Sequence, residues 1–99
     1  MNLIVTTAAD EEFQSALRFY ADRSADVADD LLMDFRGVTT QLLQFPKSGQ
    51  RLSGGVRRLL FRQFPFQLIY RVEGDNIVVY AVAHQKLRPG YWRDRVLKR

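Results

Sequence analysis

Two apolar runs joined by a short turn constrain the fold more than any other part of the sequence. The run at residues 66–72 is rich in β-branched and aromatic side chains, and the run at residues 77–83 is apolar throughout. Such residues favour strands, and an unbroken apolar run is typical of a strand that is covered on both faces. The residues between the runs, Glu73-Gly74-Asp75-Asn76, include types that readily adopt the positive φ of a hairpin turn. The pattern predicts a β-hairpin at the centre of a sheet, with His84 at the end of its second strand.

The N-terminal half predicts one short strand followed by two amphipathic helices. Residues 2–6 have the apolar, β-branched composition of a strand. Thr7 can cap a helix, and the apolar side chains that follow recur at three- and four-residue spacing as far as about Asp22. The same spacing continues from the candidate cap Ser24 to Pro46, which cannot extend a helix. These two neighbouring helices are predicted to form a helical hairpin that packs on the sheet.

The rest of the chain completes an α+β domain. Residues 46–55 are rich in Pro, Ser and Gly and are predicted to form a loop, and residues 56–62 are predicted to form a strand with basic outward positions. The tail at residues 91–97 is predicted either to form a last helical turn or to lie along the sheet. The element order is therefore β-α-α-β-β-β, with the helical hairpin packed on an antiparallel C-terminal meander. Residues 1–99 are predicted to form a single domain.

Composition excludes several classes of chemistry. The chain has no Cys, so it has neither disulfides nor a catalytic thiol, and its single His excludes a His-rich metal site. We therefore expect no metal and no other cofactor. No apolar stretch reaches the length that a membrane span needs, and the N-terminal apolar run is too short for a signal peptide. We expect a soluble cytoplasmic protein with no membrane partner.

Charge is distributed unevenly along the chain. Residues 1–45 contain eight Asp and Glu but three Arg, whereas residues 46–99 contain twelve Lys and Arg but three Asp and Glu. This asymmetry predicts two surfaces of opposite sign, of which the basic one could meet nucleic acid or an acidic protein. The alternative is a solubilising surface whose asymmetry has no binding role.

Several segments, taken in order, resemble the RelE/ParE superfamily of toxins from bacterial type II toxin–antitoxin modules. The resemblance covers nearly the whole chain, and its two longest segments look more like the ParE branch than the RelE branch. The segments are Phe19-Tyr20, Phe45-Pro46 with Gly49, Val56-Arg57-Arg58, FPFQLIYRV at residues 64–72 and AVAHQKLRPGYW at residues 81–92.

The resemblance implies a toxin that is neutralised by a cognate antitoxin, of which a flexible segment folds on contact with the toxin. It implies a hetero-oligomer that reaches operator DNA only through the antitoxin. ParE-like members inhibit DNA gyrase, whereas RelE-like members cut mRNA on the ribosome. We expect gyrase inhibition, with a ribosome-dependent mRNA endonuclease as the first alternative and a degenerate member that only binds its antitoxin as the second.

Each activity has its own candidate residues. Gyrase inhibition needs a basic and aromatic contact patch, the composition found at interface hot spots. Metal-free RNA cleavage needs a proton-transfer group and a cation on the phosphate, for which the resemblance suggests His84 or Tyr91 with Arg62. The target-binding candidates are Arg57, Arg58, Lys86, Arg88, Tyr91, Trp92 and Arg93.

Structural roles stand beside these functional ones. His84 could be a hydrogen-bonding anchor for the tail rather than a base. Tyr91 and Trp92 could pack the tail over the sheet instead of contacting a partner. Arg57 and Arg58 must point to opposite faces of their strand, so only one of the two can join a given site.

Overall fold

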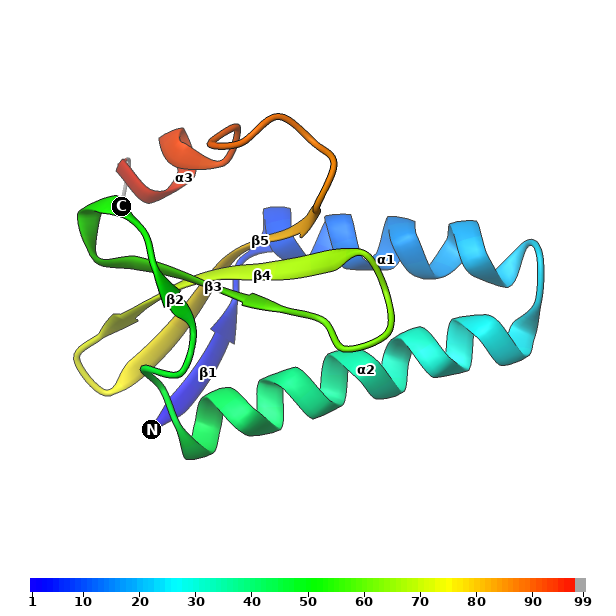
Figure 1. Ribbon diagram of the computed structural model, residues 1–99, viewed down its shortest axis with the longest axis horizontal. Coiled ribbons are helices and arrows are strands. Elements are labelled where there is room, and N and C mark those ends of the chain that lie inside the picture. Colours follow the sequence, from blue (N-terminus) through cyan, green and yellow to red (C-terminus); the bar gives the residue numbers. More distant parts are fainter. Residues whose placement is uncertain (98–99) are drawn as a thin grey trace.

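The computed structural model describes residues 1–97 as an α+β fold in which two helices pack on a five-stranded sheet (Figure 1). The α+β class and the helical hairpin predicted from the sequence are confirmed. The elements are β1 (Asn2–Val5), α1 (Thr7–Ala21), α2 (Ala25–Gln44), β2 (Gln50–Arg51), the 3-10 turn η1 (Ser53–Gly55), β3 (Val56–Leu60), β4 (Phe66–Glu73), β5 (Asn76–His84) and α3 (Arg93–Leu97).

The sheet has the strand order β1-β5-β4-β3-β2, so the predicted hairpin of β4 and β5 lies at its centre. Strands β3, β4 and β5 form the predicted antiparallel meander. The first strand, β1, pairs in parallel with β5, with Leu3 opposite Ile77. Because α1 and α2 lie between β1 and the rest of the sheet in sequence, the chain leaves the sheet after β1 and returns to it through the helical hairpin.

Both faces of β5 are covered, as its apolar sequence predicts. On one face, Val79 and Val82 pack with the helical hairpin in the larger of two cores. On the other face, Tyr80 and Ala81 pack with Trp92 of the tail in a smaller core. A β-bulge lies between these residues, because Ile69 pairs with Ala81 whereas its neighbour Tyr70 pairs with Val79. The bulge adds one residue to β5 and so directs two successive side chains to the face that the tail covers.

The tail satisfies both alternatives that the sequence left open. Residues 93–97 form the short helix α3, and the tail also lies on the sheet, where Trp92 and Val96 are buried. In Figure 1 the chain turns back after β5, so α3 lies above the sheet. The tail therefore closes the second core.

Several details of the elements differ from the prediction. Thr6, rather than Thr7, caps α1, because its Oγ1 accepts a hydrogen bond from the amide of Ala9 at 3.3 Å. The predicted loop at residues 46–55 contains β2 and η1, because two residues are enough to pair with β3 but too few to show a periodicity. Strand β3 ends at Leu60, two residues early, because the chain already turns towards β4 there.

An acidic side chain of α2 holds the turn between β3 and β4. Asp34 is 7% exposed, and its carboxylate accepts hydrogen bonds from the amides of Arg62 at 2.9 Å, Gln63 at 2.8 Å and Phe64 at 3.1 Å. A carboxylate can accept several such bonds at once, and here they satisfy three amides that no strand pairs. The turn is thereby fixed against α2. No helix within residues 1–97 is long and apolar enough to cross a membrane.

Candidate functional site

The segment after β5 carries two predicted target-binding cations. Lys86 and Arg88 are exposed, and neither forms an ion pair with another residue in the described range 1–97. His84 begins the turn, since its Nδ1 accepts a hydrogen bond from the amide of Lys86 at 3.1 Å. The imidazole also packs edge-on against Phe66, with the ring centroids 5.2 Å apart. These contacts are those of an anchor for the loop at residues 85–90.

Glu12 of α1 holds the other end of this loop through the tail. Its carboxylate accepts hydrogen bonds from the Tyr91 hydroxyl at 2.6 Å, from Arg95 Nη1 at 2.8 Å and Nη2 at 3.2 Å, and from the Val82 amide at 3.1 Å. Arg95 Nη1 also donates to the carbonyl of Tyr80 at 3.1 Å. We call Glu12, Tyr91 and Arg95 the tail clasp. Strand β1 pairs with β5 only as far as Val79, so the rest of this edge of β5 has no neighbouring strand. The clasp covers that part of the edge and bonds the Val82 amide and the Tyr80 carbonyl there.

The clasp changes the acidity of its own groups. Burial is the main cause that raises the pKa of Tyr91, and the hydrogen bond to Glu12 raises that pKa further. The hydrogen bond from Arg95 to Glu12 raises the pKa of the guanidinium. Tyr91 therefore keeps its proton, which it donates to Glu12. Sequence reasoning missed Glu12, because a glutamate in the first turns of a helix is normally a solvated residue.

Trp92 does not join a contact patch. The indole is 4% exposed, and it packs with Val78 and Tyr80 in the second core. Its neighbour Arg93 lies over the indole ring, with the guanidinium carbon 4.5 Å from the ring centroid. Arg93 Nη1 donates to the carbonyl of Ser53 at 3.0 Å, so this cation joins the tail to η1. Of the two roles that the sequence allowed for Trp92, packing and partner contact, the structure therefore shows packing, in which the indole anchors the tail to the sheet.

Arg57 and Arg58 lie away from the loop at residues 85–90. They point to opposite faces of β3, as predicted, and β4 separates β3 from β5. Arg57 Nη1 donates to the carbonyls of Lys47 at 3.1 Å and Gly49 at 2.9 Å, and Arg58 Nε donates to Gln50 Oε1 at 2.8 Å. The structure therefore divides the predicted target-binding residues between two regions of the molecule.

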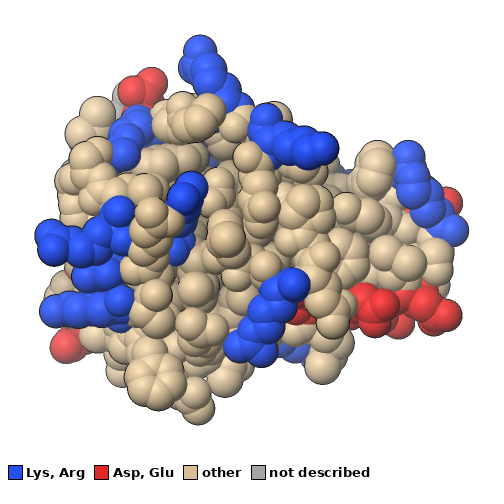
Figure 2. All heavy atoms as spheres, viewed as in Figure 1, with Lys and Arg blue, Asp and Glu red and all other residues tan. Residues whose placement is uncertain are grey.

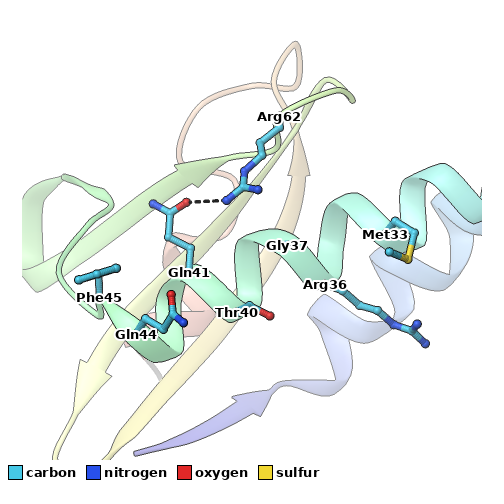
Figure 3. A pocket seen from close by; sticks show the side chains of 8 residues that line it. All are labelled: Met33, Arg36, Gly37, Thr40, Gln41, Gln44, Phe45 and Arg62. Carbon is cyan, nitrogen blue, oxygen red and sulfur yellow. Dashed lines mark hydrogen bonds between the residues drawn. The ribbon is translucent and has the colours of Figure 1, made fainter.

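Arg62 also lies apart from His84 and Tyr91. Figure 3 shows its side chain reaching over α2, where Nη2 donates to Gln41 Oε1 at 3.3 Å. Arg62 borders a hollow of about 740 Å³ whose other lining residues all belong to α2 or follow it directly, and neither His84 nor Tyr91 is among them. The three residues suggested for RNA cleavage are therefore not brought together.

A groove between α1 and β5 was not predicted. Its volume is about 510 Å³, and Tyr20, Phe66 and His84 line it together with Phe19 and Leu87. The last two residues are 51% and 53% exposed, so the groove presents apolar surface to the solvent. Phe19 lies outside the apolar spacing of α1, and this is the sequence signal that could have indicated the groove.

Figure 2 shows that acidic and basic side chains gather mainly in different regions of the visible face, although some of each sign lie in both regions. Acidic side chains gather at the end of the helical hairpin, and basic side chains gather over the end of the sheet where β2 lies. Among residues 1–97, no three His, Asp or Glu side chains are grouped so that they could hold a metal ion.

Comparisons with known proteins agree with this fold. A family model described as the ParE toxin of the type II toxin–antitoxin system parDE matches residues 3–88, from β1 to the loop after β5. A solved structure, described as the chromosomal ParDE TA system from P. aeruginosa, is similar with a TM-score of 0.73 and 23% identity, over 85% of this chain and 95% of that chain. The comparison with curated proteins gave no match. The predicted ParE branch is confirmed: the chain belongs to the ParE toxin family of type II toxin–antitoxin systems.

Proposed function

We propose that this chain is a toxin that inhibits DNA gyrase by protein contact and that a cognate antitoxin neutralises it. The observation that carries the proposal is the loop at residues 85–90, which His84 and the tail clasp hold at its two ends. Lys86 and Arg88 stay exposed on this loop. A contact surface that is ordered before binding loses less conformational entropy on association, and Arg is enriched at interface hot spots.

Contact is favoured over RNA cleavage by the placement of the candidate catalytic residues. General acid–base catalysis requires the proton-transfer group and the phosphate-binding cation to reach one substrate. Arg62 lies against α2, whereas Tyr91 lies against α1 and donates its proton to Glu12. The raised pKa of Tyr91 also makes its hydroxyl a poorer acid near neutral pH. The mRNA endonuclease is thus the alternative that the experiment must exclude, and a member that only binds its antitoxin is the third possibility.

The groove along α1 is the site that best suits the antitoxin. It offers the exposed side chains of Phe19 and Leu87, and it lies beside the edge of β5. A flexible segment could insert apolar side chains there and fold on contact, which gives a hetero-oligomer. Operator DNA would be reached through the antitoxin.

The test measures supercoiling by purified gyrase in the presence of the purified toxin. Inhibition of gyrase by the double variant Lys86→Ala/Arg88→Ala should require at least about ten times more protein than inhibition by the wild type. The reason is that loss of one hot-spot contact costs about 2 kcal/mol of binding free energy. The control Arg18→Ala removes an exposed cation from α1 and should inhibit like the wild type. A toxin that does not contact gyrase at any salt concentration would refute the proposal.

The same preparation tests the two alternatives. We expect no mRNA cleavage on translating ribosomes. Cleavage that is lost in both His84→Ala and Tyr91→Phe, while the variants stay folded, would establish the endonuclease instead. Induced expression without antitoxin should stop DNA synthesis before protein synthesis, and a toxin without any effect on growth would indicate the degenerate member. Phe19→Glu should weaken antitoxin binding and leave gyrase inhibition unchanged.

A further inference from the structure

A second basic site lies beside β2 and β3, on the far side of β4 from β5 and Lys86. There β2, the loop before it and the end of β4 border a hollow of about 330 Å³. Three cations, Lys47, Arg51 and Arg57, contribute to its lining, and no carboxylate does. The full lining is Lys47, Arg51, Gly55, Val56, Arg57 and Val72. We call the three cations the β2 cation cluster.

The backbone around the cluster is held in one conformation. The buried Tyr70 hydroxyl donates to the carbonyl of Pro46 at 2.8 Å and accepts from the amide of Gly49 at 2.9 Å. Arg57 Nη1 adds two hydrogen bonds, to the carbonyls of Lys47 and Gly49. A Cβ atom at Gly49 would lie 2.6 Å from the Tyr70 hydroxyl, so the close approach of the loop to β4 requires glycine. The loop that carries Lys47 is thus positioned before any ligand arrives.

No ion pair within residues 1–97 neutralises the charge of the cluster. The ion pairs among residues 1–97 join Arg71 to Glu73 and Arg95 to Glu12. Glu73 is the acid nearest in sequence to the lining residue Val72, but its carboxylate is bound by Arg71 and by the Tyr80 hydroxyl on the other face of the sheet. In this described range, Arg57 uses only Nη1 in its hydrogen bonds, which leaves Nε and Nη2 for a ligand.

The chemistry of the cluster selects a phosphate group. A backbone phosphate carries one negative charge, as a carboxylate does, but a nucleic acid repeats this charge along its backbone. Three cations around one hollow can therefore serve one phosphate and its neighbours, and the planar guanidinium of Arg matches the oxygens of a phosphate. The lining contains no aromatic side chain on which a nucleobase could stack. We propose that the β2 cation cluster binds a phosphate of a nucleic-acid backbone, without regard to base sequence. This site is separate from the proposed gyrase contact, and either can exist without the other.

The test is the fluorescence anisotropy of a labelled duplex DNA of random sequence, titrated with the whole toxin at several salt concentrations. Lys47→Gln/Arg51→Gln should bind at least about tenfold more weakly near 100 mM salt, and its affinity should depend less steeply on salt, since fewer counterions are released. The control Arg18→Gln/Arg36→Gln removes two exposed cations from α1 and α2, so its net charge is the same. It should stay within about twofold of the wild type, because these cations are remote from the cluster.

Three outcomes would overturn the proposal. Equal losses in the two double variants would show that only net charge matters. Saturable binding of inorganic phosphate at the cluster, with duplex affinity unchanged in Lys47→Gln/Arg51→Gln, would assign the site to a free anion. Loss of affinity for an acidic antitoxin segment, with DNA binding intact, would assign it to a protein partner. Gyrase inhibition measured on the same variant separates this result from the proposed function, because the contact loop is unchanged.

Discussion

Removal of the Glu12 carboxylate should release the tail from the sheet. The side chains of Glu12 and Arg95 are 23% and 30% exposed, so water replaces part of what the clasp loses. Hydrogen bonds to charged groups contribute about 1.5–3 kcal/mol each, and they are not additive within one network. We therefore expect Glu12→Ala to lower the free energy of unfolding by about 3 kcal/mol, and Glu12→Gln by about half of that, since the amide keeps one acceptor oxygen.

Trp92 provides the assay because it is the only tryptophan in the chain and is 4% exposed. In Glu12→Ala its emission should shift to longer wavelength and acrylamide should quench it more strongly, before global unfolding begins. The melting temperature should fall by about 12–24 °C, at 4–8 °C per kcal/mol for a domain of this size. The matched control is Glu11→Ala, which removes the neighbouring exposed glutamate and should change stability by less than about 0.5 kcal/mol.

A Glu12→Ala variant that melts like the wild type, and whose Trp92 fluorescence is quenched like that of the wild type, would contradict this prediction. That result would mean that the apolar contacts of Trp92 and Val96 hold the tail without the clasp. It would also mean that the clasp is not what orders the loop at residues 85–90 before binding. A loss of stability without any change in Trp92 quenching would place the effect in α1 instead of the tail.

Three further predictions concern stability. Asp34→Ala should lower the free energy of unfolding by about 3 kcal/mol in urea denaturation, because three amides lose a charged acceptor, whereas Asp29→Ala on the exposed face of α2 should have little effect. Gly49→Ala should lower the free energy of unfolding by about 1–3 kcal/mol, because its Cβ would lie too close to the Tyr70 hydroxyl. Gly37→Ala should leave the free energy of unfolding unchanged or raise it by up to about 1 kcal/mol, since its Cβ would lie 3.4 Å from the flexible side chain of Arg62. The contribution of the Tyr91 hydroxyl to stability should be full below pH 10 and should be lost as the pH rises above it, because Tyr91 keeps its proton in the folded state while the unfolded chain loses it. Tyr91→Phe should reduce the fall in stability in urea titrations at high pH, and an equal fall in both proteins would contradict the assignment.

Local patterns in the sequence were sufficient to predict the two long helices and the central hairpin, and the resemblance of several segments was sufficient to predict the family. The three- and four-residue spacing identified both helices, and Pro46 marked the end of the second. The unbroken apolar run at residues 77–83, which is rich in β-branched residues and follows turn residues, identified the central strand, since such a run is typical of a strand covered on both faces. These features depend on neighbours in sequence, so they can be read without the fold.

Contacts between distant residues decided the rest. The parallel partner of β1, the bulge at Tyr80 and the clasp between Glu12 and Arg95 join residues that nothing in the sequence relates. Trp92 could have been a surface contact or a core residue, and only the position of the tail on the second face of the sheet buried it. A local pattern shows which face of an element is apolar, but the partner that covers this face is determined by the packing of the whole chain.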